Sequence, residues 1–115
     1  MKLRFHGGTL RLRLSQSEVA RLAEGGQVEE AVTFAPGQVL SYALEAGSSA
    51  DVTATLRDNR IRVTIPADRA TSWAESDETG IQSSKGTLRI LIEKDFQCAH
   101  PQGEEDADAF PNPRA

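Results

Sequence analysis

Two segments of this sequence follow the same plan, and they align without a gap when one is shifted by 51 positions, which takes Gly7 onto Asp58. Each segment holds a two-residue turn signal, Gly7-Gly8 in the first and Asp58-Asn59 in the second, between runs of alternating apolar residues. Gly, Asn and Asp tolerate the positive φ angles that tight hairpin turns require. The sequence therefore predicts one β-hairpin in each half of the chain.

The turns also set the register of the two hairpins, because each residue before a turn then has one partner after it. Every apolar pair falls on the same face of its hairpin, as a half-buried sheet requires. The expected pairs are Phe5–Leu10 and Leu3–Leu12 in the first hairpin, and Leu56–Ile61, Ala54–Val63 and Val52–Ile65 in the second.

A helix is expected after each hairpin, and further strands after each helix. Ser15 and Glu18 have the spacing of a capping box, and Gly25 is placed to end the first helix. Pro66 suits the first turn of the second helix. Its apolar stripe is expected to contain Ala70, Trp73 and Ala74, and the later strands to span 28–34, 39–44 and 87–92, with a short edge strand near Ile81.

These elements predict an α+β fold of internally duplicated ββα-β units with two short helices. The pseudo-repeats cover about 1–46 and 52–96 within a single domain of residues 1–96, and an acidic, proline-containing tail covers 97–115. At 115 residues the chain has room for one hydrophobic core. A mostly antiparallel sheet is expected, either curled into a small barrel or left open and strongly curved.

Three stretches carry a family resemblance. They are the run from Leu10 to Val19, the segment Glu93-Lys94-Asp95-Phe96 with Cys98 after it, and Phe110-Pro111-Asn112-Pro113 at the end of the acidic stretch. Together they resemble a family of small bacterial proteins of unknown function. The resemblance implies a bacterial cytoplasmic protein, and it implies no activity, cofactor or site.

Composition agrees with a cytoplasmic placement. The single cysteine excludes an internal disulfide, so a reducing compartment is the expected location. No stretch approaches the roughly 18 apolar residues of a membrane-spanning helix. The net charge is −4, but four of the 17 acidic residues lie beyond residue 101, which leaves 13 acids and 12 bases in the remainder. We therefore expect a nearly neutral body and an acidic end.

The first hairpin is the candidate binding site. Its register sets Arg4 opposite Arg11 and Lys2 opposite Arg13, so four cations share one face of two strands. Like charges directly across a strand pair are destabilising. One interpretation is an anion site for a phosphorylated small molecule or an acidic peptide segment. The other is that acids from neighbouring strands neutralise the face.

The chain's own tail is a further candidate occupant of this basic face. A tail docked there would use its acidic residues for charge and one aromatic side chain as an apolar anchor. The residues expected to dock are Glu104, Glu105, Asp106, Asp108 and Phe110. The alternative is a disordered, solubilising tail.

A metal or thiol site is the alternative to a binding surface. Cys98 and His100 form one close pair, with His6 as a further candidate ligand. A structural zinc site normally needs four ligands in two close pairs, so no metal and no cofactor is expected. No third group that would orient Cys98 and His100 for nucleophilic catalysis is identifiable.

Three functions follow from these features. A non-enzymatic binding module is favoured, a small metal-binding or thiol-dependent enzyme is the alternative, and a structural subunit that covers a sheet edge by oligomerising is the third. Nucleic acid is disfavoured as a partner, because the net charge is negative and no aromatic residue lies among the strand cations. No membrane partner is expected, and the oligomeric state stays open.

Overall fold

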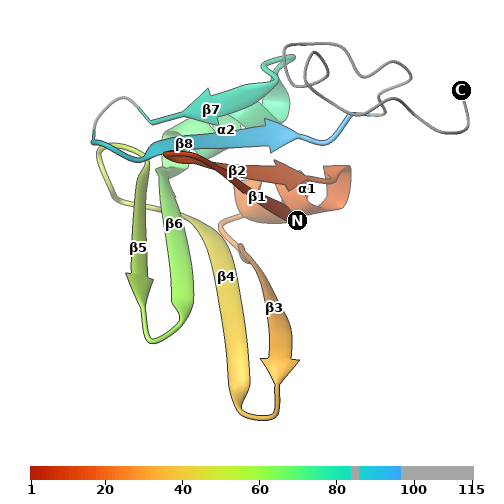
Figure 1. Ribbon diagram of the computed structural model, residues 1–115. Coiled ribbons are helices and arrows are strands. Elements are labelled where there is room, and N and C mark those ends of the chain that lie inside the picture. The colour runs from red at the N-terminus through yellow and green to blue at the C-terminus, as the bar shows by residue number, and fades with distance from the viewer. Residues whose placement is uncertain (84–85, 97–115) are drawn as a thin grey trace, which may run out of the picture.

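The computed structural model describes residues 1–83 and 86–96 (Figure 1). Within these residues the chain forms eight strands and two helices. In chain order they are β1 (Lys2–His6), β2 (Thr9–Leu14), α1 (Gln16–Ala23), β3 (Gln27–Ala35), β4 (Gln38–Gly47), β5 (Thr53–Arg57), β6 (Arg60–Pro66), α2 (Ala67–Glu75), β7 (Gly80–Gln82) and β8 (Arg89–Lys94).

Both hairpins expected from the sequence are present. Gly7 has a φ of 56°, and Asp58 and Asn59 have φ of 52° and 61°, which are left-handed values that suit tight turns. The ladders contain the pairs Leu3–Leu12, Phe5–Leu10, Ala54–Val63 and Leu56–Ile61 as expected. Val52 lies before the start of β5, although its side chain and that of Ile65 are both buried.

Both helices form where expected. The Ser15 hydroxyl accepts a hydrogen bond from the Glu18 backbone, while the Glu18 carboxylate accepts one from the Ser15 N–H at 2.8 Å, which completes the capping box. Gly25 follows α1 with a φ of +85°, a value that suits glycine after a helix. In α2, Ala70 and Trp73 are buried.

The strands form two separate four-stranded sheets, which corrects the expectation of a barrel or one curved sheet. The first sheet has the order β1-β2-β8-β7 and the second has the order β3-β4-β6-β5. No strand pairing joins the two sheets within the described residues. Four of the strand pairs are antiparallel, but β2 pairs with β8 and β4 pairs with β6 in parallel, so both sheets are mixed.

The two parallel pairs join the halves of the chain. Each hairpin takes its third strand from the other half of the chain: β8 for the first hairpin and β4 for the second. The two halves therefore have interlocking strands, with α1 and α2 in contact with both sheets. Side chains of the helices fill the space between the sheets, so their edges do not meet.

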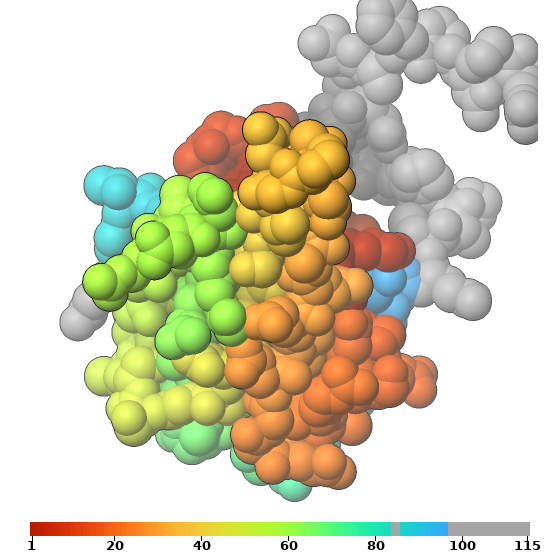
Figure 2. Space-filling model, turned by 90° about the horizontal axis from the view of Figure 1, so that it is seen from below, coloured from red at the N-terminus to blue at the C-terminus, as the bar shows by residue number. Residues whose placement is uncertain are grey.

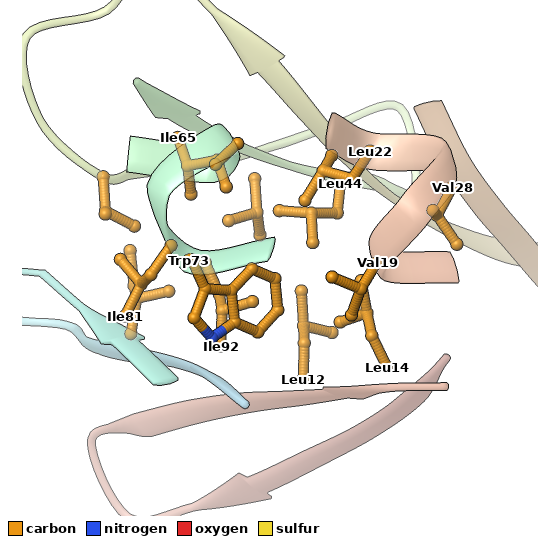
Figure 3. Close-up of a cluster of buried hydrophobic side chains, with 14 of the residues drawn as sticks. Leu12, Leu14, Val19, Leu22, Val28, Leu44, Ile65, Trp73, Ile81 and Ile92 are labelled. Atoms are coloured by element: carbon orange, nitrogen blue, oxygen red, sulfur yellow. The ribbon is translucent and has the colours of Figure 1, made fainter. Parts of the chain in front are cut away.

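The core lies between the two sheets (Figure 3). Trp73 of α2 is fully buried at its centre, surrounded by side chains from both sheets and from α1. The largest fully buried side chains are Leu10, Leu12, Leu14, Leu22, Val28, Leu44, Val63, Ile65, Trp73, Ile81 and Ile92.

Three apolar residues that we expected in buried strands are exposed. Phe5 and Leu56 are 57% and 72% exposed, because the ends of both hairpins extend past the side chains that cover their apolar face. Leu88 precedes β8 and is also exposed. In the described residues, no helix is long and apolar enough to cross a membrane.

Candidate basic hairpin site

The outer face of the first sheet carries the four predicted cations. The observed register pairs Lys2 with Arg13 and Arg4 with Arg11. Because neighbouring residues of a strand point to opposite faces, the buried Leu10 and Leu12 direct the cations of β2 outward. We call this outer surface of β1, β2 and β8 the basic face.

Strand β8 adds a fifth cation that sequence reasoning missed. The parallel ladder places Arg89 beside Thr9 and Glu93 beside Arg13, while Ile90 and Ile92 face the core. The run Ile90-Leu91-Ile92 does not alternate, so the sequence of β8 does not indicate which side faces outward. Nothing local to the sequence indicates that β8 lies beside β2, so Arg89 was not assigned to the site.

Two acids neutralise the inner end of the basic face. Lys2 Nζ lies 3.0 Å from Asp95 Oδ2, and Glu93 Oε1 lies 3.1 Å from Arg11 Nε and 3.7 Å from Arg13 Nε. The interpretation in which neighbouring acids neutralise the face therefore applies to this end, and it extends toward the turn through Arg11, which also contacts Glu93. The formal count on the face still leaves five cations against these two carboxylates.

The four predicted cations line two different hollows. The outer hollow, of about 110 Å³, lies near the turn and is lined by Arg4, His6, Thr9 and Arg11, with no acid in its lining. The inner hollow, of about 370 Å³, contains three cations and two acids. Its lining residues are Met1, Lys2, Arg13, Ser15, Ser17, Glu18, Arg21 and Asp95.

The inner hollow adjoins a network around the amino group of Met1. This group forms ion pairs with Glu18 and, at 2.8 Å, with Glu30, and the Tyr42 hydroxyl donates to the Met1 carbonyl at 3.2 Å. Burial alone would lower the pKa of the amino group, but hydrogen bonds and charges from both glutamates outweigh it and raise that pKa. The inner end of the face is thus occupied by internal pairs.

The same network shifts two further groups. Burial opposes ionisation of Glu18, but the Met1 amino group and the Ser15 N–H hold the pKa of this carboxyl below its usual value. Burial, followed by the charge of Glu30 and its hydrogen bond, raises the pKa of Tyr42. These residues secure the start of β1 against α1 and β4.

The second hairpin has a hollow at the corresponding place. The residues that align with Arg4, His6, Thr9 and Arg11 under the shift of 51 positions all line it. It is larger, about 790 Å³, and contains Asp58, and two of its arginines form ion pairs: Arg60 with Glu29, and Arg62 with Glu45 at 3.8 Å. The aligned residues are Thr55, Arg57, Arg60 and Arg62.

A fourth hollow, of about 520 Å³, lies between α1 and the end of β8, and its lining includes Val19, Ala23 and Phe96. Two charges at its rim make contacts within the chain. Lys94 donates to the Ser76 carbonyl at 2.8 Å and lies 5.9 Å from the Trp73 ring, while Asp95 pairs with Lys2.

Several predicted site residues lie outside the described residues: Cys98, His100, and the tail residues Glu104, Glu105, Asp106, Asp108 and Phe110. His6 is described and lies in the outer hollow beside two arginines, which are unfavourable neighbours for a metal cation. In residues 1–83 and 86–96, no group of three His, Cys, Asp or Glu side chains is arranged to hold a metal ion.

Comparison with known proteins yields one match. Residues 1–114 match the model of DUF7009, described as a family of unknown function. No curated protein and no solved structure matches the chain.

Proposed function

The chain belongs to DUF7009, a family of unknown function, and we propose that it is a non-enzymatic binding module whose first hairpin binds an anionic group. The observation that carries this proposal is the outer hollow of the basic face. Two arginines lie directly across the strand pair there, with a histidine and a threonine hydroxyl beside them and no acid in the lining.

The like-charge pair argues for a ligand. Cations directly opposed on a ladder cost about 0.2 to 1 kcal/mol. At the corresponding positions of the second hairpin Thr55 faces Arg62, and where that hairpin does oppose two arginines, Arg57 and Arg60, the second of them pairs with Glu29. Glu93 offsets part of the repulsion between Arg4 and Arg11, and a bound anion would offset more of it.

The size of the hollow sets the class of ligand. A volume of about 110 Å³ corresponds to about four water molecules at roughly 30 Å³ each. It suits one oxyanion, a phosphate or a carboxylate, with the rest of the ligand outside. A phosphorylated small molecule and an acidic peptide segment both carry such an oxyanion.

Nucleic acid is disfavoured, because the strands of the basic face present no outward aromatic ring near Arg4 and Arg11 for base stacking.

Binding of two probes, inorganic pyrophosphate and a fluorescent hexaglutamate peptide, tests the proposal by calorimetry and anisotropy at low salt. Replacing Arg4 and Arg11 together by Thr should weaken binding of at least one probe by about tenfold or more. The matched control replaces Arg57 and Arg62 by Thr, which removes the same charge from the second hairpin. Equal losses in both double variants, or no binding by the wild type, would overturn the proposal.

The fold adds a second proposal, that the two halves are structural repeats. Both contain the order ββαββ, and Arg13–Glu93 and Thr64–Glu45 are corresponding pairs in their parallel ladders. Residues from about 3 to 23 should superpose on residues from about 54 to 74 in an experimental structure. A different path of the chain through either unit would refute the repeat.

Two wider expectations belong to the same proposal: a bacterial origin with a cytoplasmic location, and a single domain of residues 1–96 followed by the acidic tail. The location rests on the lone cysteine and the family resemblance. Fractionation of cells that express the tagged protein checks the location, and limited proteolysis checks the boundary near residue 96.

A further inference from the structure

The β3–β4 hairpin extends from the body as an arm, which we define as residues 31–40 (Figure 1). No charged residue occurs from Ala31 to Leu44. Three large apolar side chains of the arm are solvent-exposed: Val32 at 46%, Phe34 at 70% and Val39 at 43%. Figure 2 looks at the side on which this orange-to-yellow hairpin and the green β5–β6 hairpin end. Val32 lies on one face of the hairpin and Val39, opposite Thr33, on the other, so apolar side chains are exposed on both faces of the arm, and large exposed apolar surfaces are typical of interaction sites.

Strand β3 is also an edge strand. It pairs only with β4 in the second sheet, so its other side presents backbone N–H and C=O groups to solvent. Proteins commonly protect such edges with lysine, proline or a bulge. Here no Lys or Pro lies within Gln27–Ala35, and the irregularity between Thr33 and Ala35 falls at the far end of the strand. The ladder positions from Gln27 to Thr33 remain regular.

The two acids at the base of this edge make contacts within their own chain. Glu29 pairs with Arg60, and Glu30 pairs with the Met1 amino group at 2.8 Å. Their charges are therefore offset locally, although the chain as a whole carries −4. The arm itself carries no charge, so it adds no charge repulsion between two copies.

We propose that the β3 edge pairs with the same edge of a second copy, antiparallel about a twofold axis at Ala31. A second copy offers an identical edge and identical apolar side chains, as a self-complementary interface needs. An uncharged arm does not attract a strongly charged partner electrostatically, which favours a second copy over such a partner. This inference is independent of the anion site, because it concerns the strands that follow α1 and not the first hairpin.

The charges select the register. An axis at Ala31 places Glu30 opposite Val32 and Glu29 opposite Thr33 of the second copy, so no carboxylate faces another. An axis at Glu29 or Glu30 would set that carboxylate against its own copy, which is destabilising. An axis at Val32 or beyond would leave at most three regular residues in the new ladder, 31–33, before the irregularity at Thr33/Ala35, whereas an axis at Ala31 leaves five, 29–33.

Cysteine cross-linking tests the register in a Cys98→Ala background. Ala31→Cys should form a disulfide-linked dimer under mild oxidation, because directly opposed strand residues have Cα atoms about 4.5 to 5.5 Å apart, within disulfide range. Thr33→Cys is the matched control on the same edge. In this register its copies are offset by four residues, about 13 Å, so it should not cross-link.

Sedimentation over a concentration series measures how a charge added to the β3 edge changes dimerisation in solution. In the dimer, Val32→Glu places a carboxylate opposite Glu30 of the other copy, and the twofold axis repeats this contact. The substitution should therefore raise the dimer dissociation constant by about 2- to 30-fold. Val32→Lys adds a charge at the same exposed position but places it opposite Glu30, so it should preserve or strengthen the dimer. Circular dichroism confirms that both variants are folded.

Three results would overturn the proposal. The first is a wild-type protein that stays monomeric at every concentration. The second is equal weakening by Val32→Glu and Val32→Lys, which indicates a non-specific apolar contact. The third is equal cross-linking at positions 31 and 33, which excludes a defined register.

Discussion

The Nε atom of Arg11 lies 3.1 Å from Oε1 of Glu93, and this contact joins the first hairpin to a strand from the other half of the chain. Glu93 also lies 3.7 Å from Arg13, so one carboxylate serves two cations of the basic face. Both side chains of the Arg11–Glu93 pair are half-buried, which reduces screening by solvent. Glu93 thus limits repulsion within the face and competes with any external anion for Arg11.

Glu93→Gln should therefore have two opposite effects. It should lower the free energy of unfolding by about 0.5 to 1 kcal/mol at low salt, and it should strengthen binding of the pyrophosphate or hexaglutamate probe. Urea denaturation and calorimetry measure the two effects. Glu45→Gln is the control, since Glu45 occupies the corresponding position in the second sheet and contacts Arg62 at 3.8 Å. Greater stability of Glu93→Gln would contradict the pairing.

Stability should depend on pH through Met1 and Glu18. The pKa of Glu18 is lowered by folding, so its contribution is present above the ordinary value of 4.5 and is lost as pH falls through the folded pKa. The pKa of the Met1 amino group is raised, so its contribution is present below 8.0 and is lost as pH rises through the folded pKa. The stability curve should decline at both ends.

Glu18→Gln should remove its part of the acid decline and reduce the alkaline one, because the amide can still accept the Ser15 N–H but carries no charge, while Glu30 still pairs with the Met1 amino group. Chemical denaturation at a series of pH values measures this. The matched variant Glu24→Gln changes another glutamate, just after α1, and should leave both declines in place. Identical pH profiles for wild type and Glu18→Gln would show that the ion pair contributes nothing.

The local elements of this fold were predictable, whereas their assembly was not. Gly7, Asp58 and Asn59 set turns, and Ser15 with Glu18 begins a helix, because turn and cap chemistry acts over a few residues. The pairing of β2 with β8 joins residues some 80 positions apart, and no local pattern encodes it. For this reason the sequence predicted one sheet or barrel where two interlocking sheets occur.

The candidate site was predictable to the same extent. The opposed pairs of Arg4 with Arg11 and Lys2 with Arg13 followed from one turn. The neighbours supplied by β8, Arg89 and Glu93, did not, because they depend on the parallel ladder. The exposure of Phe5 was also missed, since alternation shows which face is apolar but not how far the core extends beneath it.

Trp73 should dominate the stability of the core. It is fully buried and is the largest buried side chain, so Trp73→Ala should cost about 3 to 5 kcal/mol, a large part of the 5 to 15 kcal/mol typical of a domain. In the described residues its buried Nε1 has no hydrogen-bond partner. Trp73→Phe removes that unpaired N–H and keeps most of the packing, so its cost should be clearly smaller. Thermal melts followed by circular dichroism compare the two, and equal costs would contradict this account.

The acidic tail gives the last prediction, which rests on the sequence of residues 97–115 and on the position of Asp95. This residue contacts Lys2 at the inner end of the basic face, so the chain leaves the described domain beside the cations. Four carboxylates tethered within about fifteen residues reach a millimolar effective concentration there. We propose that the tail competes with external anions for the first hairpin.

Truncation after His100 should then strengthen binding of the hexaglutamate probe by about 2- to 10-fold at low salt, with the difference fading as salt screens the charges. Truncation also makes the chain less negative, which by itself would strengthen binding of an anionic probe. The deciding variant is therefore Phe110→Ala, which changes no charge. If Phe110 anchors the tail, its replacement by Ala removes the roughly 1.5 to 3 kcal/mol that burial of the Phe side chain contributes. Phe110→Ala should therefore reproduce most of the gain in binding, and both variants should lower the melting temperature. Unchanged melting together with unchanged probe binding in the truncated chain would show that the tail does not occupy the basic face.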